Sequence, residues 1–514
     1  MAIPKSPVGK PARCGFYPMH LLLPSEDIVR SSSSFLSLRH TLPNVTIACG
    51  LLLLTLALSA CGSGSSPSTG TTPTPTPAAK TTVQVNMGDS PADWMLAFSM
   101  NVSSMTLTGS NGNATVVSTS TPMEMMHLMG TMQPLAMVSA PQGSYTGATV
   151  TIGSATVMYM DPTTKAPVQA TISGPITGSV TFTSPITVGS TPMAMGFDLD
   201  LGSSVTQGSN GALSMNPVFH VTSGTQGSGN PMDYADGGVN QMMGMVSGVS
   251  GSSFTMTSMQ AAQTFTFATN SSTTFDGTSM SAMGSGMLAL VDATMQSDGS
   301  LLATRVQSMM GSSGGMMGGG IITAVTGQPP TSLTMVMQNG AGASMMSSYF
   351  ASGATVNLSS STTYEMDEDG MDMTSLPFTP AFDANHIYAG QSVMPISSTG
   401  MMSGSGGMGG GMMGGGSMAG TITANEVALE PQGITGTASV TLTGGTATSF
   451  AMTLPSDSAF TTLSGATSVM VFQQGSTTME GGSTIASGTA MHTFGLLFYD
   501  GGQWKMVAMR MGAN

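Results

Sequence analysis

The chain alternates apolar and polar residues in short runs along most of its length. Examples are Thr81–Met87, Ala148–Ile152 and Ser253–Thr257, and Gly, Asn or Asp-Gly interrupts such runs about every 8 to 12 residues. Period-two alternation between regularly spaced turn residues is typical of β-strands. Beyond residue 80, no long stretch keeps helical apolar spacing with good helix formers. We therefore predict an all-β protein.

Residues 81–222 are predicted to form the first domain. Three short motifs follow one another in this segment: Asp89-Ser90-Pro91-Ala92-Asp93 after an opening strand, then Pro141-Gln142-Gly143-Ser144-Tyr145, then Phe197-Asp198-Leu199-Asp200. In this order they resemble an uncharacterised bacterial lipoprotein domain family. The resemblance implies a β-sandwich and carries no established activity.

Taken as residues alone, these motifs have structural roles. Asp89 and Asp93 are expected to cap a turn that Pro91 makes rigid. Alternation along a strand places Asp198 and Asp200 on the same face, which is more typical of a solvated face than of a functional carboxylate pair. We therefore expect no site at either motif.

The rest of the chain is predicted to repeat one small module. Residues 238–310 resemble a second uncharacterised family, a small β-barrel similar to an OB-fold. Related strand segments recur over residues 319–430, which include a Met/Gly-rich loop at 400–418, and more divergently over 432–514. The predicted architecture is an N-terminal β-sandwich followed by two or three OB-like barrels, joined by Gly/Ser/Met-rich linkers such as 309–320.

An export signal precedes these domains. Val45–Ala60 is apolar, follows Arg39 and His40, and ends in Leu58-Ser59-Ala60-Cys61. This resembles the lipobox of bacterial lipoproteins, which implies that residues 1–60 are a leader, that Cys61 carries the lipid, and that the exported part is held at a membrane. Gly62 favours the outer membrane in a diderm cell. Residues 61–80, rich in Ser, Thr and Pro, are expected to be a disordered tether.

The net charge limits the classes of partner, and the cysteine content limits the disulfides that can form. After Cys61 the chain has 22 acidic and five basic residues, and such a surface repels phosphate backbones. Nucleic acid is therefore not an expected partner. The other two cysteines, Cys14 and Cys49, lie in the leader, so the exported part has no internal disulfide. No nucleophile elbow, phosphate loop or metalloprotease motif occurs, and we expect neither catalytic activity nor a cofactor.

Methionine is the compositional anomaly, with 52 residues. One segment concentrates thioethers beside a histidine and supplies candidates for a Cu(I) or Ag(I) site: Met123, Met125, Met126, His127, Met129 and Met132. Met125, Met129 and Met132 also have one-turn spacing, so the segment is alternatively a short amphipathic helix. Methionine also replaces Leu or Ile in ordinary strands at little cost, and thioethers can absorb oxidants.

A second candidate is the acidic run Glu365–Asp372, which resembles the first half of a calcium loop. Leu376 stands where such a loop needs its bidentate Glu, so only a weak surface site is expected.

The sequence favours a structural, adhesive or scaffold lipoprotein with envelope proteins or glycans as partners. The alternatives are a periplasmic soft-metal binder and a glycan-binding envelope protein, although only two Trp and eight Tyr are present to stack on sugars.

Overall fold

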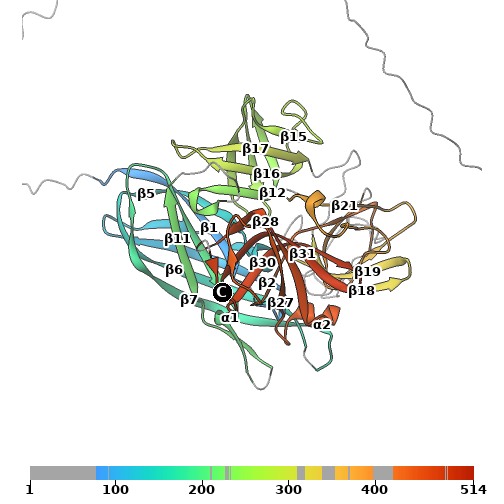
Figure 1. The fold of residues 1–514 in the computed structure, drawn as a ribbon. Coiled ribbons are helices and arrows are strands. Elements are labelled where there is room, and N and C mark those ends of the chain that lie inside the picture. Colours follow the sequence, from blue (N-terminus) through green and yellow to red (C-terminus); the bar gives the residue numbers. More distant parts are fainter. Residues whose placement is uncertain are drawn as a thin grey trace, which may run out of the picture. The chain divides into compact units, whose positions relative to one another are not determined.

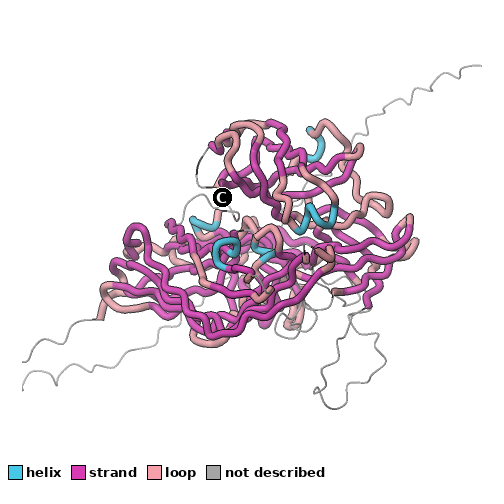
Figure 2. The backbone as a smooth tube through the Cα atoms, turned by 90° about the horizontal axis from the view of Figure 1, so that it is seen from below, coloured by secondary structure: helices cyan, strands magenta, loops and turns pink. Residues whose placement is uncertain are grey.

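β-Strands make up nearly all the regular structure. The computed structural model describes residues 77–513 except 91, 162, 209–210, 226–230, 232, 309–318, 339–352, 369–370, 398–420, 481 and 483. Within these residues the helices are limited to single turns and the short α2, Ala459–Ser464 (Figure 2). The all-β prediction is confirmed. In the described part of the chain no helix is long and apolar enough to cross a membrane.

The first module is a β-sandwich whose two sheets enclose one core. One sheet has the order β11-β8-β1-β5, and the other has the order β3-β2-β6-β7 with β4 also paired to β2. Their strands are β1 Lys80–Ser90, β2 Met95–Gly109, β3 Ala114–Val117, β4 Thr121–Glu124, β5 Met132–Pro141, β6 Gly143–Met160, β7 Pro167–Val188, β8 Met193–Asp200 and β11 Phe219–Thr225. Alternate residues such as Val83, Val85 and Met87 on β1 face this core.

The second module is a closed ring of five strands with a sixth at its margin. Antiparallel pairing runs β14-β13-β12-β16-β17, and a parallel pairing of β14 with β17 closes the ring. β15 pairs parallel to the far end of β17. The strands, green to yellow in Figure 1, are β12 Gly238–Ser250, β13 Ser253–Ser258, β14 Thr264–Ala268, β15 Thr274–Asp276, β16 Leu288–Met295 and β17 Leu301–Ser308.

The same pairing pattern recurs in the two modules that follow. In the third, β18 pairs with β19 and β22, while β20 and β21 run parallel to the consecutive strands β23 and β24. In the last, β25 pairs with β27 and β30, and β28 runs parallel to β31 in two separate stretches. The strands are β18 Gly320–Gly327, β19 Pro330–Met337, β20 Ala354–Asn357, β21 Thr363–Met366, β22 Ser392–Ile396, β23 Thr421–Thr423, β24 Glu426–Leu429, β25 Gln432–Ala438, β27 Thr448–Thr453, β28 Ser468–Met479, β30 Ala490–Asp500 and β31 Gln503–Ala513.

Hydrophobic cores extend from one module into the next. Leu496, Phe498 and Val507 of the last module belong to the same buried cluster as Ile322 and Leu333 of the third. Another cluster joins residues of the first, third and last modules: Leu96, Ala97, Met158, Met160, Val336 and Ala459. All described residues belong to one compact unit, Pro75–Asn514.

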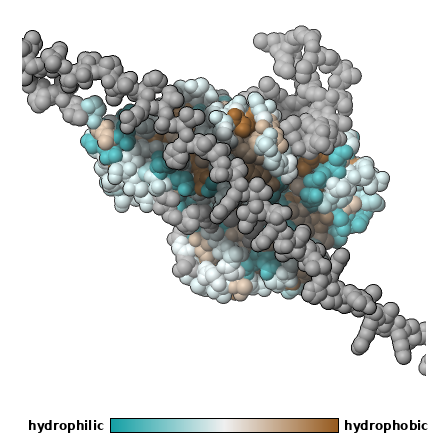
Figure 3. Space-filling model, turned by 90° about the horizontal axis from the view of Figure 1, so that it is seen from above, coloured by the Kyte–Doolittle hydropathy of each residue, from teal (hydrophilic) through white to brown (hydrophobic). Residues whose placement is uncertain are grey.

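Long-range hydrogen bonds reinforce these shared cores. The side chain of Gln338 donates to the carbonyl of Leu96 at 2.6 Å, and that of Gln391 donates to the carbonyl of Leu497 at 3.0 Å. The predicted linker 309–320 and loop 400–418 lie outside the described residues, apart from Gly319 and Gly320. The described surface in Figure 3 is mostly pale to teal, and its exposed large hydrophobic residues are Met245, Val249 and Val440.

Candidate functional site

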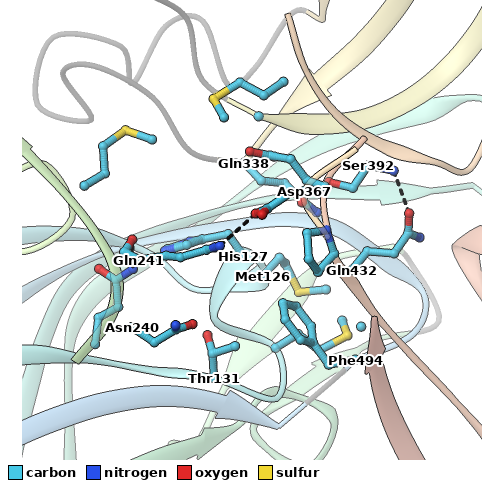
Figure 4. A pocket seen from close by; sticks show the side chains of 18 of the residues that line it. Met126, His127, Thr131, Asn240, Gln241, Gln338, Asp367, Ser392, Gln432 and Phe494 are labelled. Carbon is cyan, nitrogen blue, oxygen red and sulfur yellow. Dashed lines mark hydrogen bonds between the residues drawn. The ribbon is translucent and has the colours of Figure 1, made fainter. Parts of the chain in front are cut away.

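All four modules contribute to one cavity of about 110 Å³. Figure 4 shows its side chains converging from separate strands. Lining residues used below are Met126, His127 and Met129 from the first module, Gln241 and Met243 from the second, Asp367, Ser392 and Met394 from the third, and Gln432, Gly433 and Phe494 from the last, with Glu430 just before β25. The volume suits an ion with a few waters and is too small for a typical organic ligand.

A buried carboxylate fixes the histidine of this cavity. Glu124, at the end of β4, accepts hydrogen bonds from the backbone N–H groups of Phe98, Met126 and His127 at 3.0–3.2 Å. Its Oε2 also lies 2.9 Å from Nδ1 of His127. A carboxylate that receives three amide protons is an acceptor, so Nδ1 of His127 is the donor in this pair. In the neutral form of the imidazole, Nε2 then keeps the lone pair.

The Nε2 atom of His127 is buried and has no hydrogen-bond partner. An unsatisfied buried polar atom costs roughly 1–3 kcal/mol. A carboxylate that orients one ring nitrogen while the other remains available is the arrangement found behind metal-ligating histidines. His127 is therefore arranged as a ligand.

The Met-rich candidates do not stay together. Met123, Met125, Met126 and Met129 all belong to the sandwich core, but only Met126 and Met129 also line the cavity. Met132 begins β5 and lines a different cavity. The alternative of an amphipathic helix is wrong, because only Met126–Leu128 form a single 3-10 turn before β5 starts. Turn and strand geometry send neighbouring methionines in different directions.

Two further cavity methionines were not among the candidates. Met243 on β12 and Met394 on β22 pack together in a small buried cluster with Leu288. Each occupies an ordinary strand position in the sequence, so only the docking of the second and third modules reveals them. Gly433 on β25 matters as well: a Cβ there would lie 2.2 Å from the sulfur of Met129, so this thioether rests directly on the strand.

The remaining wall of the cavity is polar and acidic. Gln241 donates to Asp367 at 2.7 Å, and Gln432 accepts from the backbone N–H of Ser392 at 2.5 Å (Figure 4). Burial raises the pKa of Glu430 to about 8, and the charge of Asp367 adds to the increase. None of the described lining residues is Lys or Arg, so the cavity favours a cation over an anion.

The acidic run 365–372 does not form a common ligand set within its described residues. Asp367 points to Gln241, while Asp372 accepts from the N–H and hydroxyl of Thr374 and caps a 3-10 turn. Residues 369 and 370 lie outside the described part. Throughout the described chain, no group of three or more His, Cys, Asp or Glu is placed to hold a metal ion.

A second cavity, of about 330 Å³, is lined by acidic residues for which the sequence predicted no site. Asp89 lies fully inside the protein and neither carboxylate oxygen has a hydrogen-bond partner, so it caps no turn. Burial raises its pKa well above the ordinary value, and nearby Asp198 adds to the increase. Asp93 instead reaches Thr435 of the last module. The prediction for Asp89 was wrong because β1 is buried on both faces near its end.

Asp198 and Asp200 are both half-buried, and Asp198 is the more shielded of the two. Asp198 accepts from the hydroxyl of Ser90, and burial raises its pKa. Asp200 caps the single turn Leu201–Ser204 by accepting from the N–H of Ser203 at 2.8 Å. Asp198 faces the second cavity, beside the charged residues Glu480, His492 and Arg510.

Cys61 lies outside the described residues. Among known families, a domain of unknown function, DUF5666, matches residues 243–307. The predicted resemblance of the second module to an uncharacterised family is thereby confirmed. A search of curated proteins finds no match to the chain. The second module is therefore similar to a family that has no assigned activity, and the cavity has to be interpreted from its own chemistry.

Proposed function

We propose that the chain is a lipid-anchored, extracytoplasmic scaffold protein of the cell envelope that has no catalytic activity. The observation that carries this proposal is the sharing of buried cores between modules, as between Phe498 of the last module and Ile322 of the third. Shared cores hold several surfaces in a fixed arrangement, which an adhesive or scaffold protein requires. The partners that such surfaces would bind are other envelope proteins.

The attachment follows from the segment that ends at Cys61. An apolar run closed by Leu58-Ser59-Ala60-Cys61 and followed by a Pro/Thr-rich tract fits a leader, a lipid attachment point and a tether. In a diderm cell, Gly62 directs the anchor to the outer membrane. The first strand begins at Lys80, so the tether leads directly into the sandwich.

A glycan-binding function has less support from the described residues. The aromatic rings of the last module are used for packing: Trp504 contacts Tyr388, Phe460 and Tyr499 at centroid distances of 5.0–5.9 Å. The exposed large hydrophobic residues, Met245, Val249 and Val440, include no aromatic ring to stack on a sugar.

Replacing Cys61 with serine is expected to release the protein from the membrane. The serine hydroxyl does not accept the diacylglycerol, so the variant should appear in the soluble extracytoplasmic fraction or retain its leader. Fractionation and intact-mass analysis of the protein from its own cells measure both outcomes. Cys49→Ser, which changes a cysteine within the leader, is the matched control and should leave the lipidated form unchanged. Retention of the Cys61→Ser variant at the membrane as a processed protein would refute the anchor.

A further inference from the structure

We propose that the cavity around His127 binds one soft monovalent metal ion, Cu(I) or Ag(I), through Nε2 of His127 and thioethers from three modules. The first ligand is the imidazole. Glu124 holds the Nδ1 proton, so Nε2 of the neutral imidazole presents a lone pair at a buried position that no protein donor reaches. Filling that position with an ion offsets the cost of the unsatisfied nitrogen.

The first module also supplies two thioether ligands. Met126 and Met129 flank His127 in sequence, and all three side chains line the cavity. Thioether sulfur is a soft, uncharged ligand that favours Cu(I) over Zn²⁺, Mg²⁺ or Ca²⁺. Gly433 leaves room for Met129, whose sulfur would otherwise collide with a side chain there. Packing therefore orders this thioether before an ion arrives, which lowers the entropic cost of binding.

Two further thioether ligands come from the second and third modules. Met243 and Met394 line the same cavity and belong to the same buried cluster, although they come from the second and third modules. A soft ion bound by these residues together with His127 joins three modules. Binding is therefore expected to stabilise their docking as well as to occupy the site.

Charge and size fit the same ion. Asp367 gives the cavity wall a negative potential that compensates a monovalent cation without entering its coordination. Hard cations need several carboxylate or carbonyl oxygens, and no such cluster of His, Cys, Asp or Glu occurs among the described residues. The volume of about 110 Å³ accommodates an ion with its ligands and excludes larger organic molecules.

The test is a competition titration of the full mature chain with Ag(I), and with Cu(I) under reducing conditions, against a chromogenic chelator. We expect one ion per chain with a dissociation constant below about 1 μM. His127→Gln should weaken binding by at least about 10-fold. Met126→Leu and Gly433→Ala should each weaken it, because the first removes a thioether and the second displaces Met129. Met125→Leu is the matched control, since this methionine lies in the sandwich core, and its affinity should not change.

The double replacement Met243→Leu/Met394→Leu tests the contribution of the other modules. Leucine keeps nearly the same volume, so folding is expected to survive, and circular dichroism checks this. We expect weaker binding and loss of the ion-induced rise in melting temperature. If His127→Gln weakens binding and the double variant does not, the ion belongs to the first module alone and the joining of modules is refuted. Binding no tighter than micromolar, or equal binding by wild type and His127→Gln, refutes the site itself. Neither result affects the lipid-anchored scaffold, which the Cys61→Ser fractionation tests separately.

Discussion

Replacing Arg510 with methionine should lower the free energy of unfolding by about 3–5 kcal/mol. The guanidinium is 6% exposed and lies 3.1 Å from a carboxylate oxygen of Glu480. It also donates to the carbonyl of Gly130 at 2.9 Å and stacks over the ring of Tyr234 at 4.5 Å. Glu480 is 32% exposed and keeps His492 at 2.9 Å, so the cost arises mainly on the side of Arg510: its replacement leaves the Gly130 carbonyl without this donor, removes the contact with Tyr234 and takes one partner from Glu480.

The same residue connects the first module to the last, so its loss acts at a module boundary. Chemical unfolding followed by tryptophan fluorescence measures the change. Arg305→Met is the control, because the Arg305–Asp276 pair at 2.6 Å is 29% and 48% exposed. An exposed pair of this kind contributes at most about 1 kcal/mol. An Arg510→Met effect no larger than that of Arg305→Met would show that the buried network has no special role.

Stability should fall by roughly 6 kcal/mol as the pH rises from 5 to 8, with about 3 kcal/mol from each of two buried carboxyl groups. Burial raises the pKa of Asp93 to about 7 and that of Glu430 to about 8, and both values are well above those of an unfolded chain. Between pH 4 and these values the folded protein keeps protons that the unfolded chain has lost. Raising the pH removes these protons, so the stability present below pH 4 is lost as the pH passes through 7 and 8.

Calorimetry or chemical unfolding at several pH values measures this slope. Asp93→Asn keeps an oxygen acceptor for Thr435 and removes the titrating carboxyl, so it should flatten the curve between pH 5 and 8. Asp161→Asn is the control: backbone N–H groups of Thr164 and Thr163 lower the pKa of Asp161, so its effect is confined to acidic pH. Rising stability between pH 5 and 8 would contradict the prediction.

Alternation of apolar and polar residues predicted the strands, whereas the sandwich was implied by the resemblance to a domain family. Segments such as Ser253–Thr257 carry their own pattern, because one face packs on a core and the other meets water. Strand β1 shows the limit of this reasoning. Gln84 and Asn86 have polar side chains, yet both are buried, because the face they occupy hydrogen-bonds to Gly238 and Tyr234. A partner surface from elsewhere in the chain is not encoded in local pattern.

The cavity was predictable only in part for the same reason. The density of soft ligands around His127 predicted a metal site. Sequence spacing could not show that Met129 lines the cavity, on Gly433, and that Met125 does not. Met243 and Met394 join them through module docking, and each sits in an unremarkable strand. Free lone pairs likewise follow from tertiary hydrogen bonds, as Glu124 shows for His127.

The cavity exists only where the modules meet, so the modules are expected to unfold as one cooperative body. Differential scanning calorimetry of the full mature chain tests this most directly. We predict a single transition whose calorimetric and van 't Hoff enthalpies agree, and which Arg510→Met shifts as a unit to lower temperature. Two or more separable transitions, with only the last module responding to Arg510→Met, would contradict it.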